Sequence, residues 1–349
     1  MGVTQKEIAR RLNLSQSLVA GVLGNRPGIW VSQEKRDLIL RTARELGYRP
    51  NAAARSLRSG KTHVVACVFL GSCGYQAVAE ALADRLAVHG YDLLVRVVTD
   101  IGQQGDRVHR LLVPGVCDAV AIWGLEPDIL AVGKILEAAG VPFVVKGRLE
   151  RERPHWFQVD FDHEAMMDGA LAWIASHGRR RVAYIGYDNG LVYTQRLREG
   201  FDAACREHIG AEADPAFIAE VPEGVEAACA AAERWLDASS GAAPDAIVIG
   251  AGPAAWLGVE VALVRRGRCI GTGPSDVVVT GIGSTTPLLY GQAVCYDGAD
   301  LVLIAAAMVD ALLVPMLSGR MPSSAVVRLV PPLRRRPSLD LPAGPSRAP

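Results

Sequence analysis

The sequence predicts an α/β protein in which a small all-helical head precedes a larger part built from two doubly wound parallel sheets. The head is predicted because the first sixty residues carry helix caps and helically spaced apolar residues but no strand-like run. From Val64 onward, short apolar runs alternate with amphipathic stretches, as in parallel sheets covered by helices on both faces. This second pattern is too long for one sheet and suits two.

The charge of the chain is unevenly distributed. The 349 residues have a net charge of zero, but residues 1–62 hold twelve Lys and Arg against four Asp and Glu, a net charge of +8. The rest of the chain therefore carries −8. A basic head on an acidic body indicates a head that meets a polyanion, and the alternative is a solvated surface that is merely basic.

The sequence also argues against several classes of protein. It lacks a run of eighteen uncharged apolar residues, and its polar, basic N-terminus lacks the apolar core of a signal peptide. Its seven cysteines are scattered without a C-x-x-C pair, which favours reduced thiols in a cytoplasm. Neither metal spacing among the seven histidines nor a hydrolase or P-loop motif is present. We therefore expect a cytoplasmic protein with no membrane span, metal, cofactor or enzymatic activity.

The head, residues 1–48, has the pattern of a helix-turn-helix domain. Thr4 begins a capping box and starts the first helix, and Ser15 caps a second short helix after a break of two residues. Ser32 caps a third helix, which Gly47 ends. Two short helices separated by a tight turn and backed by a third are typical of this domain.

The start of the second helix would face base edges in a major groove. Gln16 suits a bidentate pair with adenine, and Ser17 suits a base or a phosphate. Leu18 would contact a thymine methyl or lie in the core. Ala20 and Gly21 cannot donate from their side chains, so we expect Gly21 to permit close approach of the DNA.

Residues 49–62 are expected to link the head to the rest of the chain. Pro50 disfavours helix at the residue before it, and Asn51 can cap a new helix over residues 52–57. A helix of two turns is marginal alone and needs a partner.

Beyond the linker, strands and helices should alternate along the chain. We expect strands near 64–70, 91–98, 118–123, 142–146, 181–186, 245–250 and 277–282. We expect helices near 75–89, 127–139, 163–177, 193–207, 224–238, 254–265 and 299–317.

The run Ile247–Ala255, IVIGAGPAA, raises an enzymatic alternative. A glycine-rich turn between strand and helix is typical of dinucleotide sites, so a flavin- or nicotinamide-dependent oxidoreductase using Gly250–Ala255 has to be considered. Such a site needs a carboxylate at the end of the next strand, but that strand ends in Gly283 and no carboxylate follows before Asp297. A turn whose glycines permit tight packing explains the run better.

The motifs VTQKEIARRLNLSQSLVAGVLGNRPG and GYRPNAAARSLRSGKT resemble the LacI/GalR (lactose-repressor) family of bacterial transcription regulators. The resemblance is specific over residues 3–62 and continues loosely through Val159–Asp162 and Arg179–Gly186. It implies a repressor that binds a near-palindromic double-stranded operator as a homodimer, or as a tetramer. It also implies a core like the periplasmic binding proteins, with a small-molecule effector between two lobes.

This resemblance sets the expected domains. The core would span 63–338, with a first lobe of 63–160 and 293–322 and a second lobe of 161–290 and 323–338. A disordered tail rich in Pro, Ala and Ser would occupy 339–349.

In the linker, the resemblance implies that Asn51 caps a hinge helix, Ala54 contacts the minor groove, and Leu57 inserts between base pairs. The alternative is that Leu57 is an ordinary apolar linker residue. The full expected DNA-contacting set is Thr4, Gln16, Ser17, Leu18, Ala20, Gly21, Asn25, Arg26, Asn51, Ala54, Arg55, Leu57 and Lys61.

The head also differs from the family pattern at several positions. Family members usually carry a phosphate-contacting Ser or Thr in place of Ala20 and often a base-reading Arg in place of Gly21. The loop after the second helix holds two extra residues, Ile29 and Trp30.

Carboxylates that sugar-binding members place in the cleft are replaced here by Gly147, Gly252-Pro253 and Gly283, and the clamping Arg position is Leu197. We therefore expect an anionic or planar effector rather than a typical sugar, or a cleft that has lost its effector and a regulator that responds only to protein partners. The residues left to form the site are Tyr75, Trp123, Lys146, Arg148, Phe161, Arg196, Arg198, Trp256 and Tyr296, and each of the aromatic ones could equally belong to the core.

Overall fold

The structure is a computed structural model of the chain, which forms two units, Met1–Thr62 and His63–Pro349. Each unit is described by itself. The residues that the structure describes are 3–24, 28–48, 56, 60–71, 75–147, 149–151, 153, 155–237, 243–283, 293–297 and 300–335.

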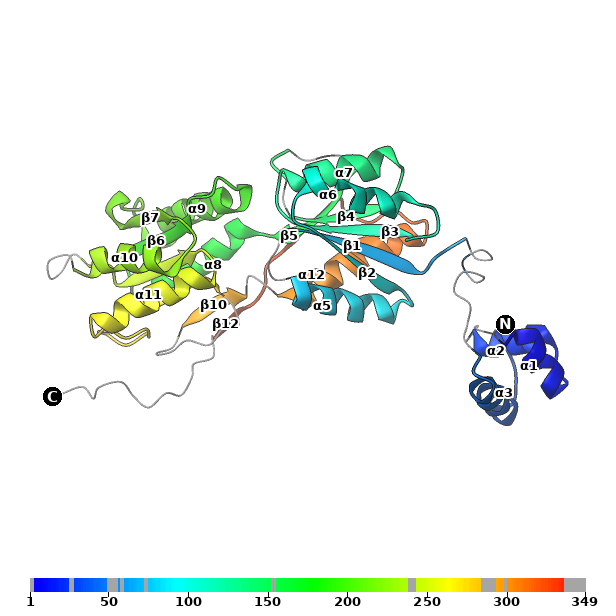
Figure 1. Ribbon diagram of the computed structural model, residues 1–349. Coiled ribbons are helices and arrows are strands. Elements are labelled where there is room, and N and C mark those ends of the chain that lie inside the picture. The colour runs from blue at the N-terminus through cyan, green and yellow to red at the C-terminus, as the bar shows by residue number, and fades with distance from the viewer. Residues whose placement is uncertain are drawn as a thin grey trace. The chain divides into compact units, whose positions relative to one another are not determined.

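The head consists of three helices, α1 (Gln5–Leu12), α2 (Gln16–Leu23) and α3 (Gln33–Glu45), as Figure 1 shows. The hydroxyl oxygens of Thr4, Ser15 and Ser32 accept backbone N–H bonds of 3.3, 3.3 and 3.4 Å, so all three predicted caps are present. Asn13 adopts the left-handed conformation, with φ of 53°, and makes the tight turn between α1 and α2. The core of the head is formed by Ile8, Ala9, Val19, Val22, Ile39 and Ala43.

The first lobe of the larger unit is built on a parallel sheet with strand order β11-β5-β4-β3-β1-β2. In Figure 1, α6 and α7 cover one face of this sheet, and α5 and α12 cover the other. Alternate residues of β1 serve the two faces: Val65 and Cys67 pack toward α5, while Ala66 and Val68 pack toward α7. Its strands are β1 (Val64–Leu70), β2 (Asp92–Val98), β3 (Ala119–Trp123), β4 (Phe143–Lys146), β5 (Phe157–Phe161) and β11 (Val326–Leu329). Its helices are α5 (Tyr75–Val88), α6 (Ile101–His109), η1 (Arg110–Leu112), α7 (Asp128–Ala138), α12 (Leu301–Ala306), η4 (Ala307–Leu313) and α13 (Val314–Leu317).

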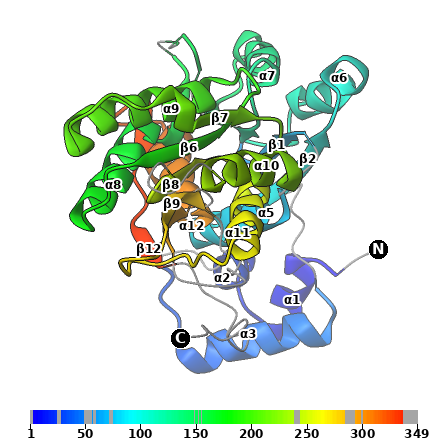
Figure 2. The ribbon, with the colours of Figure 1, turned by 90° about the vertical axis from the view of Figure 1, so that its left-hand side faces the viewer.

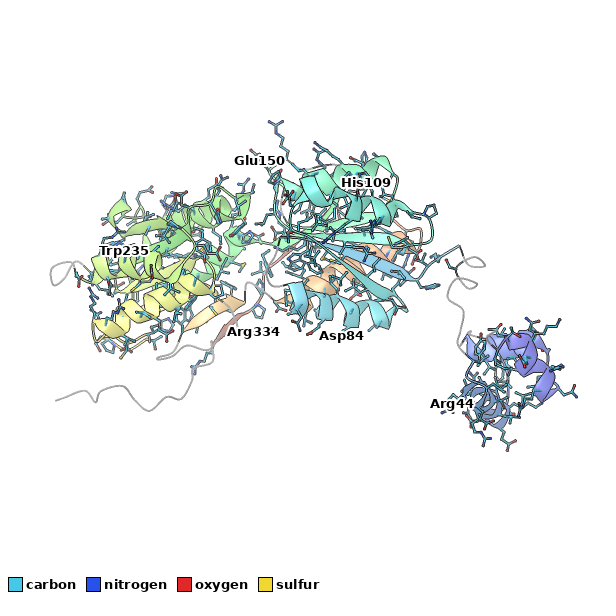
Figure 3. The ribbon with its side chains drawn as sticks, in the orientation of Figure 1. Arg44, Asp84, His109, Glu150, Trp235 and Arg334 are labelled. Carbon is cyan, nitrogen blue, oxygen red and sulfur yellow. The ribbon has the colours of Figure 1, made fainter. Side chains whose placement is uncertain are left out.

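The second lobe repeats the plan with strand order β12-β10-β9-β8-β6-β7, in which only the edge strand β12 is antiparallel. Figure 2 shows α8 and α9 on one face of the sheet and α10 and α11 on the other. Trp235 of α10, labelled in Figure 3, is buried, and its Nε1 donates to the carbonyl of Ala216 at 2.9 Å. The strands are β6 (Val182–Tyr187), β7 (Ile218–Val221), β8 (Ala246–Gly250), β9 (Val278–Gly283), β10 (Val294–Asp297) and β12 (Leu333–Arg335). The helices are α8 (His163–Ser176), α9 (Val192–Ala204), η2 (Cys205–Ile209), η3 (Pro215–Phe217), α10 (Val225–Leu236) and α11 (Pro253–Arg265).

Among the described elements, the chain passes between the two sheets three times: from β5 to α8, from β10 to α12, and from β11 to β12. This corrects the expected lobe boundaries. The expected first-lobe segment 293–322 contains β10, which pairs with β9 in the second sheet. The expected second-lobe segment 323–338 contains β11, which pairs with β5 in the first. Both strands have four residues, and so short an apolar run does not reveal which sheet it joins.

The α/β class predicted from the sequence is confirmed. Among the described residues, no helix has the length and hydrophobicity to cross a membrane. The expected tail, residues 339–349, lies outside the part of the chain that the structure describes.

Candidate nucleic-acid interface and ligand cleft

The start of α2 presents polar side chains to solvent, as predicted. Gln16 and Ser17 are exposed in the first turn, and Leu18 and Ala20 are half-buried. The hydroxyl groups of Ser15 and Ser17 lie 3.2 Å apart. The buried Val19 of the same helix is anchored in the head core, so the helix is held with its polar first turn outward.

Gly21 does not face open solvent. It is buried, and a Cβ built on it would lie 2.7 Å from Cδ1 and 2.8 Å from Cγ1 of Ile29. The expectation that Gly21 gives DNA close access is therefore corrected, because Ile29 of the following loop fills that space. The sequence could not show this, since it does not say where the longer loop folds.

The remaining predicted DNA-contacting residues fall into two groups. Thr4 caps α1, and Lys61 is exposed near the end of the first unit. The others lie outside the described residues; they are Asn25, Arg26, Asn51, Ala54, Arg55 and Leu57.

A cavity of about 270 Å³ lies where the carboxyl ends of the strands of both sheets meet, which is where ligands bind in open α/β sheets. Much of its wall is apolar, with polar groups at a few points. From the first lobe it is lined by Gly124, Leu125, Glu126, Ile129, Lys146, Gly147, Asp160 and Phe161. The residues that line it after β5 are His163, Tyr187, Leu191, Val192, Tyr193, Leu197, Gly250, Ala251, Gly252 and Ile282.

A buried ion pair stands in the first-lobe wall. Nζ of Lys146 lies 3.3 Å from Oδ1 of Asp160 and 5.4 Å from the ring centroid of Trp123. Asp160 is 5% exposed, and among the described residues its Oδ1 has no hydrogen bond besides this ion pair. A charge pair removed from water is costly to separate, so Lys146 and Asp160 stabilise each other, and the pair itself adds no net charge to the wall.

The cleft therefore does contain carboxylates, which corrects the expectation from the sequence. Asp160 belongs to β5, a strand that the apolar pattern did not predict because Gln158 and Asp160 interrupt it. Glu126 also lines the cavity, and its Oε2 accepts the backbone N–H of Glu150, labelled in Figure 3, at 3.0 Å.

Two phenol groups in the second-lobe wall are neutral donors at physiological pH. Burial raises the pKa of Tyr187, and burial likewise raises the pKa of Tyr193. Nδ2 of Asn189 donates to the Tyr193 oxygen at 3.3 Å. These phenols can bond a ligand without adding charge.

Arg196 and Arg198, two of the three arginines expected at the cleft, are not among the described residues that line the cavity. Nη1 of Arg196 lies 2.9 Å from Oε2 of Glu199, and its Nε lies 3.8 Å from Glu164. Nε of Arg198 lies 3.1 Å from Asp202. The helical spacing of these carboxylates on α9 holds the guanidinium groups along the helix.

The predicted aromatic residues are divided between core and cleft. Phe161 lines the cavity, and Trp123 contacts Lys146 beside it. Trp256 is buried and donates Nε1–H to the carbonyl of Ile282 at 2.6 Å, while Tyr296 is buried against α8. The side chain of Tyr75 and all of Arg148 lie outside the described part of the chain.

The glycine-rich turn after β8 serves packing. Gly250 lies beside the buried ring of Tyr184, where a Cβ would lie 2.7 Å from Cε2. Gly186 on the neighbouring strand leaves space for the same ring. The turn also lines the cavity through Gly250, Ala251 and Gly252. The glycines therefore make room for Tyr184, as the packing interpretation predicted.

One surface group among the described residues could hold a metal ion: Asp168, Glu207 and His208 bring their ligand atoms together. Nε2 of His208 lies 2.7 Å from Oδ1 of Asp168, which an ordinary surface ion pair explains.

A helix-turn-helix head joined to a two-lobed α/β core defines a class of DNA-binding transcription regulator. No family model matches the chain. The chain is 28% identical over 296 residues to the HTH-type transcriptional regulator AglR of Rhizobium meliloti, covering 83% of this chain and 80% of that protein.

Solved structures show the same fold. A regulatory protein of the LacI family from Chloroflexus aggregans aligns with a TM-score of 0.66 at 19% identity, over 79% of this chain and 99% of that one. The lac repressor dimer bound to operator and the anti-inducer ONPF aligns with a TM-score of 0.69 at 19% identity, over 97% and 100%. With the motifs of the head, these similarities support the resemblance to the LacI/GalR family. Its relatives are transcription regulators, and the oxidoreductase alternative is set aside.

Proposed function

We propose that the protein is a repressor in the bacterial cytoplasm, associated with the nucleoid, that binds a near-palindromic operator as a homodimer. The observation that carries this proposal is the exposed, polar first turn of α2 in a first unit, residues 1–62, whose net charge is +8. Gln16 and Ser17 would contact base edges while basic side chains neutralise phosphates.

Two exposed valines support self-association. Val88 of α5 is 71% exposed and Val302 of α12 is 76% exposed, and these helices lie side by side on one face of the first lobe (Figures 1 and 2). Exposed apolar side chains on adjacent helices favour an interface with a second copy. A two-fold dimer would present two heads, so its site should be symmetric. The mass of the chain in solution distinguishes a monomer, a dimer and a tetramer.

We further propose that a small ligand in the cavity gates DNA binding, by moving the lobes and thereby the linkers that carry the heads. The cavity favours a planar, largely apolar ligand with one polar edge. Its ion pair is internally balanced, and among the described residues that line it, apolar residues and glycines outnumber polar side chains, which suits such a ligand better than a polyhydroxylated sugar. This narrows the expectation of an anionic or planar ligand to the planar class.

A panel of ligands in a thermal melt tests the gating proposal. A planar ligand with a polar edge should raise the Tm of the full chain and change its affinity for DNA. Stabilisation by simple sugars instead would contradict the ligand class. If no ligand in a broad metabolite panel shifts the Tm, the gating proposal fails, and a regulator that responds only to protein partners takes its place.

Asp160→Asn should lower the free energy of unfolding by about 1–3 kcal/mol, because Lys146 loses its partner in a largely buried place. Urea denaturation measures this effect. The double variant Lys146→Met/Asp160→Leu is the control and should recover most of the loss, because it removes both charges. If the single variant is as stable as the wild type, the ion pair between Lys146 and Asp160 does not stabilise the first-lobe wall.

Leu57→Ala should weaken binding to the operator about tenfold or more, because unstacking a base step depends on an apolar side chain between the bases. Binding to unrelated duplex, which is driven by salt, should hardly change. Lys61→Ala is the control and should weaken both kinds of binding alike. Equal losses for both duplexes in Leu57→Ala would contradict the insertion of Leu57.

A further inference from the structure

Ile29, in the described part of the connection between α2 and α3, lies against the DNA-facing helix. Ser17 and Gly21 are four residues apart and therefore share one stripe of α2. Ile29 packs on this stripe at Gly21, so close that its side chain would have to shift if residue 21 carried a side chain. Two departures from the family pattern are thus linked. Gly21 has no side chain, and Ile29, one of the two additional loop residues, fills the space that a side chain would take.

The packing of its neighbours keeps the side chain of Trp30 exposed to solvent. Its neighbours Ile29 and Val31 both pack against the head core, and Ser32 caps α3. Trp30 itself is 96% exposed, whereas the next most exposed large apolar side chain among the described residues of the head, Leu38, is 40% exposed. Keeping the apolar surface of an indole in water costs free energy. Because the residues on both sides of Trp30 are anchored, the ring cannot turn inward, so we expect a partner to cover it.

We propose that Trp30 contacts the operator, packing its ring on the deoxyribose-phosphate backbone beside the groove that α2 enters. DNA is the favoured partner because Ile29 fixes the loop on the stripe that carries Ser17, and because the head around it is basic. An indole has an apolar face for a sugar and an N–H for a phosphate oxygen. The inference rests on the DNA-binding function of the chain and assigns a contact to the longer loop.

Trp30→Ala in the full chain should weaken operator binding about tenfold to a hundredfold, because two rings per dimer are lost. Trp30→Phe should retain most of the affinity. Leu38→Ala, which removes another exposed apolar residue of the head, is the matched control and should bind like the wild type. Hydroxyl-radical footprinting should show that Trp30→Ala loses protection of sugars beside each half-site but keeps it at the centre.

Acrylamide quenching tests the contact directly. The difference in fluorescence between the wild type and Trp30→Phe reports on Trp30, and saturating operator should shield it from acrylamide. Unchanged affinity in Trp30→Ala, or unchanged quenching on DNA, would overturn the proposal. If Trp30→Ala instead lowers the oligomeric mass and leaves the affinity of each dimer for DNA intact, the ring contacts protein and the proposal is also overturned. A wild type that binds no DNA would refute the function itself, which separates the two failures.

The role of Gly21 has its own test. Gly21→Ala should displace Ile29 and weaken operator binding, while Gly21→Ala/Ile29→Ala, which removes the clashing atoms, should restore part of it. In a Trp30→Ala background, Gly21→Ala should have a smaller effect, because both changes act through the same contact. Circular dichroism of each variant checks that the head is folded. If Gly21→Ala weakens operator binding equally with and without Trp30, Gly21 does not act through the contact between Trp30 and DNA.

Discussion

Replacing Gln16 by alanine is expected to lower operator affinity by about 30-fold or more while affinity for unrelated duplex stays within a few-fold. A bidentate amide pair discriminates by about 1–3 kcal/mol per base, and a dimer would lose two such pairs. Titration of both duplexes at one fixed salt concentration measures the difference.

The matched control is Gln33→Ala. Gln33 also stands in the first turn of a helix of the head, but its Nε2 donates to Asp37 of the same helix at 3.1 Å. This variant should bind the operator like the wild type. If both variants lose the same affinity, or if Gln16→Ala loses none, α2 does not read bases through Gln16.

Gly250→Ala is expected to destabilise the core by about 1–3 kcal/mol, because the added methyl overlaps the buried ring of Tyr184. The ring lies between β8 and α9 and is held at 4.7 Å, between centroids, from the buried Phe201. Chemical denaturation of the full chain measures the change. The DNA affinity of the folded protein should be retained, since the head folds around a core of its own.

The neighbouring Gly252→Ala is the control for that result. A Cβ there would lie 3.1 Å from the Tyr187 oxygen, which needs only a small shift, so the loss should be smaller. In a Tyr184→Leu background, Gly250→Ala should lower the free energy of unfolding by less than it does in the wild type. An equal cost of Gly250→Ala with and without the Tyr184 ring would show that the glycine is needed for another reason.

The sequence was most informative where local chemistry decides the structure. The hydroxyl caps at Thr4, Ser15 and Ser32 fix the starts of the head helices, and all three are present. Each strand predicted from a continuous apolar run is found, because a strand buried on both faces carries its own pattern. The strands that were missed are short or interrupted by polar residues, as β5 is by Gln158 and Asp160.

The sequence was least informative where distant residues decide the structure. The role of Gly21 depends on where Ile29 folds, and the chemistry of the cleft depends on Lys146 and Asp160 meeting across two strands. Arg196 was expected at the cleft because it adjoins the position of the family's ligand-clamping arginine. In the structure, carboxylates three residues along α9 and on α8 bind its guanidinium group. Composition alone shows neither which charges meet nor which cavity they face.

Selection of duplexes from a random pool by the full chain tests whether two heads recognise a symmetric DNA sequence through α2. If two basic heads contact base edges through α2, the pool should converge on one near-palindromic sequence. The variant Gln16→Ala should then lose base preference at the positions of each half-site that α2 contacts. A pool that stays random after repeated rounds, with binding that depends only on salt, would contradict the account.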